Sequence, residues 1–133
     1  MRKSSETPFR SWNGVEPFEF VDGVRLTAIG GEQVLLCRVT YDPGKKVPLH
    51  SHDHTEQVMV IVDGSVDMAI EGEWRTLSAG DVVVVNRGLE HELHSGGGVT
   101  FFEALSPVPR DHVPDAERDL VLGPDGGAGH VAK

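Results

Sequence analysis

Five of the seven histidines fall into two short stretches of the sequence. His50, His52 and His54 lie within five positions, and His91 and His94 follow about forty residues later. Along an extended strand, side chains at i and i+2 point to the same face, so His50 and His52 can converge on one point. Imidazole nitrogens at that separation suit a borderline divalent metal ion, whereas the alternative for such a pair is a polar surface loop.

Short apolar runs must position these histidines. Runs rich in Val, Ile, Leu, Phe and Thr recur about every 8 to 12 residues between Val15 and Ser106, separated by glycine-containing turns such as Asp63-Gly64. This spacing predicts an all-β fold, a single small antiparallel barrel or sandwich. The all-valine run Val82–Val85 further predicts a buried strand that is covered on both faces, by sheet or by a partner. We expect strands at residues 24–29, 34–41, 57–62, 66–70, 74–77, 82–85, 90–94 and 99–105.

The composition is that of one globular domain. The chain has 133 residues, of which 38% are hydrophobic, and a net charge of −9 that argues against nucleic acid and anionic membranes as partners. We expect an irregular N-terminal arm over 1–14, the barrel over 15–112 and a flexible C-terminal tail over 113–133. The absence of a signal peptide or an apolar stretch of bilayer length, together with a single cysteine, Cys37, predicts a cytoplasmic protein.

The spacing around the histidines resembles the two motifs of the cupin superfamily. Gly44 is followed by five residues and then His50-Ser51-His52, and a second stretch runs from Gly80-Asp81 to His91, with Asn86 where this motif usually carries proline. The resemblance covers about residues 34–106. It implies a small cupin barrel, or jelly roll, with one divalent transition metal ion inside one mouth. It also implies that the first motif supplies two histidines and a carboxylate or amide, and the second supplies His91.

Glu56 and Gln57 compete for the place of the fourth ligand, because neighbours on a strand point to opposite faces. Cupins usually leave six residues between this ligand and the next turn glycine, and Gln57 leaves six before Gly64 whereas Glu56 leaves seven. Gln57 is therefore favoured. The resulting metal ligands accept Zn, Ni, Fe or Mn, and because they are neutral they favour polarising an oxygen over activating O2. The predicted set is His50, His52, Gln57 and His91.

This set resembles one cupin subfamily in particular, the KdgF-type proteins of uronate catabolism. Those proteins convert 4,5-unsaturated monouronates to open-chain 5-keto-4-deoxyuronates. The sequence departs from the subfamily at Leu105, where an aromatic residue is usual, and at Arg110, which lies one residue further out. Glu103 faces the interior if Phe101 and Leu105 do, and would then be a candidate proton carrier; the alternative is an outward charge. Arg110 is a candidate clamp for a substrate carboxylate, or else a solvated arginine.

The resemblance implies a metal-dependent enzyme, an isomerase or lyase that opens or tautomerises a small, carboxylate-bearing substrate such as a 4,5-unsaturated uronate. Three alternatives stay open: a polyketide cyclase-like cupin of secondary metabolism, an Fe-dependent dioxygenase that would need the carboxylate of Glu56, and a non-catalytic metabolite-binding cupin. Exposed sheet edges and the apolar Val82–Val85 strand also predict a homodimer.

Overall fold

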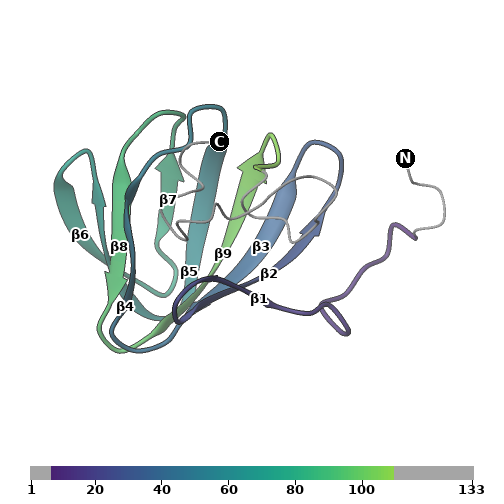
Figure 1. Cartoon of the computed structure of the whole chain (residues 1–133), viewed down its shortest axis with the longest axis horizontal. Coiled ribbons are helices and arrows are strands. Elements are labelled where there is room, and N and C mark those ends of the chain that lie inside the picture. The colour runs from purple at the N-terminus through teal and green to yellow at the C-terminus, as the bar shows by residue number, and fades with distance from the viewer. Residues whose placement is uncertain (1–6, 110–133) are drawn as a thin grey trace.

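The computed structural model describes residues 7–109, which form an all-β, nearly closed antiparallel barrel (Figure 1). This confirms the predicted fold class. Within the described residues no helix is long and apolar enough to cross a bilayer. The strands are β1 (Phe18–Val21), β2 (Val24–Gly30), β3 (Leu35–Tyr41), β4 (Lys45–His50), β5 (Glu56–Ile70), β6 (Glu73–Ser78), β7 (Val82–Val85), β8 (His91–Ser95) and β9 (Val99–Ser106).

The long strand β5 joins the two walls of the barrel. The strand order is β1-β2-β3-β9-β5-β8-β4, and β6 and β7 also pair with β5. The first half of β5 pairs with β9 and β7, whereas its second half pairs with β8 and β6. The two walls therefore enclose a common interior, and each strand points every second side chain toward it.

The prediction of two strands with a turn at Asp63-Gly64 is wrong, because β5 runs through this point as one strand of 15 residues. Asp63-Gly64 bends the strand instead of reversing it. The pairing with β9 shifts register between Ile61 and Asp63, and Gly64 has φ +80°. A Cβ at Gly64 would lie 2.3 Å from the carbonyl oxygen of Gly98, so only glycine fits the close approach of these two strands.

Strands β1 and β4 were missed by the sequence pattern. Strand β1 is the first and β4 the last in the strand order, so each has a neighbouring strand on one side only. Strand β4 contains two lysines and Pro48, and its register with β8 shifts between Val47 and His50. Proline is tolerated at such an edge because it has no N–H to donate to a second neighbour. The polar, proline-containing sequence therefore hid a strand that carries a candidate ligand.

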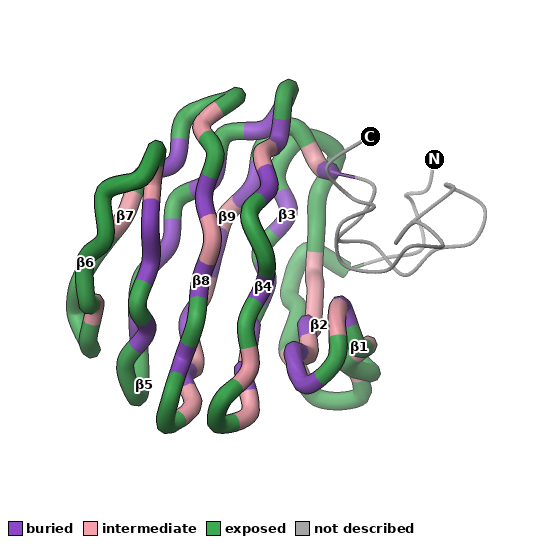
Figure 2. The backbone as a smooth tube through the Cα atoms, turned by 60° about the vertical axis from the view of Figure 1, so that its left-hand side comes forward, coloured by how far each residue is buried: buried purple, intermediate pink, exposed green. Residues whose placement is uncertain are grey.

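Alternation between buried and exposed residues sets the core. Along β9, Val99, Phe101, Glu103 and Leu105 are buried, and the residues between them are half-buried. Figure 2 shows the same alternation of buried positions along the strands. The inward direction expected for Phe101, Glu103 and Leu105 is thus the one observed, and it places a carboxylate among apolar core side chains.

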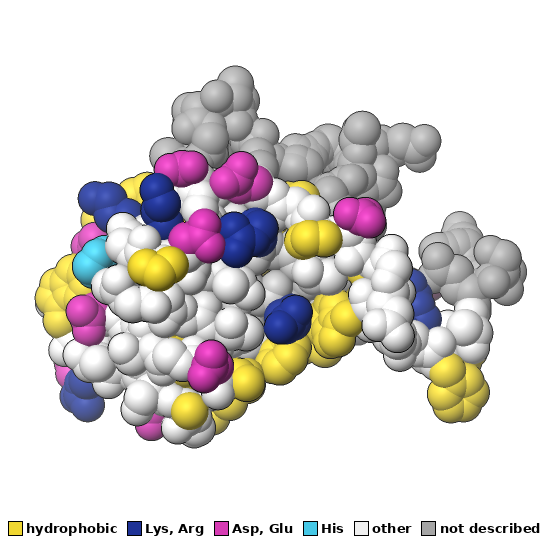
Figure 3. Space-filling model, turned by 90° about the horizontal axis from the view of Figure 1, so that it is seen from below, with side chains coloured by type: hydrophobic (Ala, Val, Ile, Leu, Met, Phe, Trp, Pro, Cys, Tyr) yellow, Lys and Arg dark blue, Asp and Glu magenta, His cyan; other side chains and the backbone are white. Residues whose placement is uncertain are grey.

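Within this chain, Val82–Val85 is covered on one face only, and the expected cover of the other face by a partner stays a prediction. Val82 is 61% exposed and Val84 is 50% exposed, whereas Val85 is buried. Exposed Val82 and Val84 alternate with the half-buried Val83 and the buried Val85, so one face of β7 lies open on the outside of the barrel. Figure 3 shows hydrophobic side chains gathered along one side of the molecule. A run of valines can thus mark an exposed apolar surface as well as a doubly buried strand.

The boundaries predicted for the arm, the barrel and the tail stay predictions. Strands begin at Phe18 and end at Ser106, and the residues before β1 are irregular from position 7 onward. The predicted tail, 113–133, lies outside the described residues.

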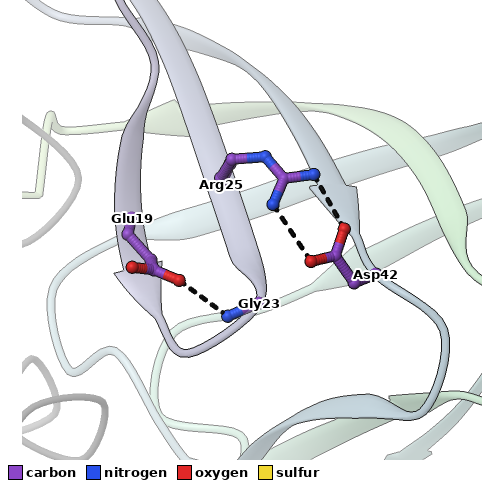
Figure 4. Close-up of polar contacts among 4 residues, drawn as sticks. All are labelled: Glu19, Gly23, Arg25 and Asp42. Atoms are coloured by element: carbon purple, nitrogen blue, oxygen red, sulfur yellow. Dashed lines mark hydrogen bonds and ion pairs between the residues drawn. The ribbon is translucent and has the colours of Figure 1, made fainter.

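Polar contacts tie the β1–β2 hairpin to the end of β3 (Figure 4). The Glu19 carboxylate accepts a hydrogen bond from the Gly23 amide at 2.9 Å. Arg25 donates two hydrogen bonds to Asp42, at 2.8 and 3.2 Å. Lys45 at the start of β4 adds an ion pair with Asp22 at 3.0 Å. These contacts fix the strand β1 at the end of the barrel near the start of β4.

Replacing Asp42 by asparagine is expected to make folding stability less dependent on acid. The hydrogen bond from Arg25 is the main cause that lowers the pKa of Asp42, so its stabilisation is present above the unfolded pKa of about 3.9 and is lost as the pH falls through the folded value. Urea unfolding should show wild type more stable than Asp42→Asn at pH 7, with the difference vanishing at low pH. A difference as large in acid as at pH 7, or an equal effect of the exposed control Glu32→Gln, would contradict this.

Candidate metal centre

Three histidines from two segments meet inside the barrel. His50 is the last residue of β4 and His91 is the first residue of β8, and the antiparallel register places them directly opposite each other. His52 follows in the loop after β4. All three are buried, and His91 is fully so. The predicted sharing of one site by His50, His52 and His91 therefore rests on strand pairing across forty residues of sequence.

The three rings are close enough to share one ion. One nitrogen from each ring can be chosen so that all three lie within 4.8 Å of one another. The ring centroids of His50 and His91 are 4.1 Å apart, and those of His50 and His52 are 5.2 Å apart. Because zinc binds imidazole nitrogen at about 2.0–2.1 Å, small rotations of these side chains would bring them onto one divalent ion.

Backbone carbonyls select the ring nitrogens that face the site. Nδ1 of His50 lies 2.6 Å from the carbonyl oxygen of Pro48, and Nδ1 of His91 lies 2.9 Å from that of Leu89. A carbonyl can only accept, so Nδ1 carries the proton in each ring and Nε2 keeps its lone pair. Metal-binding histidines in proteins are typically held in this way. The chemistry of these residues therefore fits a divalent metal ion.

Gln57 lies next to this cluster in the same interior, and Glu56 does not. Gln57 is buried, whereas Glu56 points outward on β5 and is exposed. Nε2 of Gln57 donates a hydrogen bond of 2.6 Å to Oε1 of Glu103, which fixes the orientation of the carboxamide. Its oxygen, Oε1, is buried and has no hydrogen-bond partner among the described residues. A buried acceptor without a donor is costly, and a metal ion would satisfy it.

Glu103 reaches Gln57 diagonally across two strands. Gln57 on β5 pairs with Leu105 on β9. Glu103 lies two positions before Leu105 and pairs with Met59 on one neighbouring strand and Cys37 on the other. Met59 and Cys37 are both fully buried. The carboxylate that the sequence suggested as a proton carrier is therefore also the group that orients the candidate amide ligand.

Tyr41 is an interior residue that the sequence reasoning missed. It is buried at the end of β3 and lines the same small cavity as His50, His52, Gln57 and Glu103. Burial raises the pKa of its hydroxyl well above the usual value, and the negative charge of Glu103 adds to this effect. Tyr41 is thus a neutral phenol at pH 7. Its inward parity with Cys37 and Val39 on the predicted strand 34–41 was the available signal.

The cavity is small. Its volume is about 30 Å³, and apart from the polar groups its walls are apolar side chains. A cavity needs about 10–15 Å³ of such space to hold one water molecule. The interior therefore has room for an ion or one small group, and a larger ligand would have to enter from the barrel mouth by displacing side chains.

A glycine positions the loop that carries His52. The Gly88 amide donates a hydrogen bond of 2.9 Å to the carbonyl oxygen of His52, and Gly88 has φ +82°. This bond connects the loop after β4 to the loop before β8. The two stretches that supply the histidines are thereby held together at the barrel end.

The remaining candidates lie elsewhere. His54 is exposed in the loop after β4, and His94 is exposed on the opposite face of β8 from His91, because positions three residues apart on a strand point to opposite faces. Arg110 lies outside the described residues, so its role as a carboxylate clamp stays a prediction.

Comparison with known proteins identifies the class. Residues 37–103 match the family profile described as "Cupin domain", which covers half of the chain. The chain therefore belongs to the cupin family. The three buried histidines of the candidate site, His50, His52 and His91, all lie within the matched region.

Individual relatives are distant. The chain is 28% identical over 99 residues to the auxin-binding protein ABP19b of Prunus persica, which covers 68% of this chain and 47% of the relative. It is 23% identical over 101 residues to the tetracenomycin polyketide synthase protein TcmJ of Streptomyces glaucescens, a match that covers 74% of this chain and 68% of TcmJ. The chain spans about half the length of the auxin-binding relatives that it matches.

Solved structures share the fold. An RmlC-like cupin from Shewanella frigidimarina superposes with a TM-score of 0.75 at 22% identity, covering 81% of this chain and 97% of that one. KdgF from Halomonas sp. superposes with a TM-score of 0.74 at 21% identity, covering 81% of this chain and 100% of KdgF. Likeness at this identity establishes a small single-domain cupin fold and leaves the substrate to be proposed from the site.

Proposed function

We propose that this cupin is a metal-dependent isomerase that opens and tautomerises a small hydroxylated acid, with a 4,5-unsaturated monouronate as the leading substrate. The observation that carries the proposal is the donor set: three buried histidines beside a carboxamide oxygen that lacks a hydrogen-bond donor. When bound there, a divalent ion would supply a Lewis acid that polarises substrate oxygens.

The side chains of this protein suit an isomerisation. Ring opening of such a substrate moves one proton from the hemiacetal hydroxyl to a ring carbon, so the change needs no oxidant. Glu103 is a buried carboxylate in the wall of the cavity, where it can accept or return that proton. Tyr41 remains protonated in the same wall and can donate a hydrogen bond to a substrate oxygen. The substrate class itself is taken from the resemblance of the predicted ligand set to KdgF-type cupins, with which the shared fold is compatible.

The dioxygenase alternative required a carboxylate ligand that the interior does not receive from Glu56. That reading required Glu56 as a fourth ligand, and Glu56 is exposed on the outer side of β5. The polyketide alternative keeps one supporting observation, the similarity to TcmJ across most of this chain. The apolar Leu105, which is fully buried in the interior, is compatible with an aromatic precursor.

The test is turnover of a 4,5-unsaturated monouronate under argon, followed by NMR of the alkene proton. Zinc- or nickel-loaded protein should consume the alkene at least a hundredfold faster than metal-stripped protein, and His91→Ala should behave as the stripped protein does. Equal rates with and without metal would contradict the proposal, as would a requirement for oxygen. Tight binding without turnover would favour the non-catalytic alternative, and turnover of an enolisable aromatic polyketide alone would favour the TcmJ-like one.

A further inference from the structure

The outer surface of the wall formed by β6, β5, β8 and β4 carries a hollow that the interior site does not use. Figure 2 shows these four strands side by side at the front. Strand register aligns one outward-pointing residue from each strand into a single row, Thr76, Asp67, His94 and Lys46. The hollow over this row has a volume of about 590 Å³ and is lined by the row together with Trp74, Arg75 and Glu92. We call these seven residues the outer hollow.

An open tryptophan ring forms one side of the outer hollow. Trp74 on β6 pairs with Ala69 on β5, which pairs in turn with Glu92 on β8. Ala69 points to the same side as Asp67, because the two lie two positions apart on one strand. It is nevertheless only 2% exposed, so the larger side chains around it cover it, whereas Trp74 itself is 53% exposed. The wall therefore presents an indole surface to solvent above a small, covered alanine.

The polar groups beside this ring include both hydrogen-bond donors and acceptors. Lys46 can only donate, the carboxylates of Asp67 and Glu92 can only accept, and the His94 ring can do both. The Thr76 hydroxyl donates a hydrogen bond of 2.7 Å to Asp67, which holds that carboxylate in place across two strands. Donors and acceptors thus stand next to each other along the row, within reach of one aromatic surface.

The charges of the outer hollow limit which ligand fits. Two carboxylates face Lys46, and Arg75 donates to Glu73 at 2.9 Å, so the local charge is slightly negative, as that of the whole chain is at −9. Anionic ligands, nucleic acid included, are therefore repelled. A cationic ligand would meet the lysine and find one aromatic ring in place of an aromatic cage. A protein partner fits poorly as well, because Lys, Asp and Glu are depleted from protein interfaces.

An uncharged pyranose sugar has the properties that remain. Each of its hydroxyl groups can donate and accept a hydrogen bond, and the C–H groups on one side of its ring are apolar and can stack on an indole. The volume of about 590 Å³ lies in the range of small-molecule sites. It exceeds what a single ring needs, so the outer hollow has room for a short chain of such rings.

We propose that the outer hollow binds uncharged pyranose rings, as free sugar or as part of a glycan. One ring stacks on Trp74, and its hydroxyl groups bond to Asp67, Glu92 and Lys46. Because the outer hollow lies on the outside of the wall, this binding requires neither a metal ion nor the isomerisation proposed above.

Tryptophan fluorescence tests the proposal, since the chain has two tryptophans, Trp12 and Trp74. In a Trp12→Phe background only Trp74 emits, and maltotriose, cellotriose and xylotriose are titrated beside glucose and xylose. At least one sugar should change the emission saturably, with a dissociation constant on the order of 1 mM, because an open site makes few contacts with a small ligand. A trisaccharide that binds tenfold more tightly than its monosaccharide indicates a glycan ligand, and equal affinity indicates a free sugar.

NMR titration of the full chain with the sugar that binds locates the site. Amide shifts should concentrate on β6, β5 and β8. Trp74→Ala and Asp67→Ala should each weaken binding at least tenfold, whereas Phe9→Ala, which removes a ring that is 87% exposed elsewhere, should bind as wild type does. Metal-stripped protein and His91→Ala should also bind as wild type does, so this result is separate from that of the uronate assay.

Several outcomes would overturn the proposal. These are the lack of a saturable response to any of the five sugars, binding that survives Trp74→Ala, binding lost in Phe9→Ala or on removal of metal, and shifts confined to the barrel interior. A sedimentation coefficient that changes in Trp74→Ala would also overturn it, because the tryptophan would then belong to a contact between proteins.

Discussion

Replacing His91 by alanine is expected to abolish zinc binding by the folded protein. His91 is fully buried opposite His50, and its Nδ1 contact with Leu89 directs Nε2 to the site. Losing an outer partner of a ligand typically costs 10–100-fold in metal affinity, so losing a ligand of a three-histidine cluster should cost more. Zinc affinity, measured against a competing chelator, is the readout.

Thermal unfolding gives the same prediction a second readout. A ligand at 100 times its dissociation constant stabilises a folded protein by about 2.7 kcal/mol, so zinc should raise the Tm of wild type and leave His91→Ala unmoved. His94→Ala, an exposed histidine on the same strand, should respond to zinc as wild type does. His91→Gln keeps a polar group in the buried site if the alanine variant is too unstable to purify. A variant at position 91 that still binds one zinc ion with wild-type affinity would refute the assignment.

Replacing Glu103 by alanine is expected to weaken both folding and metal binding. The substitution removes the acceptor of the buried Gln57 amide, which should cost about 1–3 kcal/mol of unfolding free energy. It also frees the carboxamide to turn, so zinc affinity should fall roughly 10–100-fold, as expected for loss of a group that orients a ligand. Urea unfolding and chelator competition measure the two effects.

Glu103→Gln separates orientation from proton transfer. A glutamine keeps an acceptor oxygen for Nε2 of Gln57, so zinc affinity should stay within a few-fold of wild type. It cannot carry the proton, so turnover of the uronate should fall steeply if Glu103 is the proton carrier. Unchanged zinc affinity in Glu103→Ala would show that the hydrogen bond to Gln57 does not position the ligand. Unchanged turnover in Glu103→Gln would remove Glu103 from the reaction.

Parity along strands explains what the sequence revealed about the site. An inward Glu103 between Phe101 and Leu105 follows from period-2 alternation, which also requires Glu56 and Gln57 to point to opposite faces. The choice of Gln57 as the inward residue came from the cupin spacing to Gly64. What parity cannot supply is the pairing between distant strands. The hydrogen bond from Gln57 to Glu103 depends on the β5–β9 register, which a single sequence does not encode locally.

The differences between prediction and structure arise where long-range packing overrides a local sequence pattern. Asp63-Gly64 looks like a hairpin turn, but the approach of Gly98 needs a glycine within a continuous strand. Pro48 looks like a strand breaker, but it lies on an edge strand where no second neighbour needs its N–H. Val82–Val85 looks covered on both faces because apolar residues on an exposed sheet face and in a core have the same composition, and within the chain only one face is covered. In each case long-range packing decides between two readings of the same residues.

The most direct test of the account is a crystal structure of the zinc-loaded protein with anomalous diffraction recorded at the zinc edge. We expect one interior peak, with nitrogen atoms of His50, His52 and His91 at about 2.0–2.1 Å and the carboxamide oxygen of Gln57 as the fourth protein ligand. An ion bound elsewhere, one that fewer than all three histidines hold, or a Gln57 oxygen turned away from it would contradict the account.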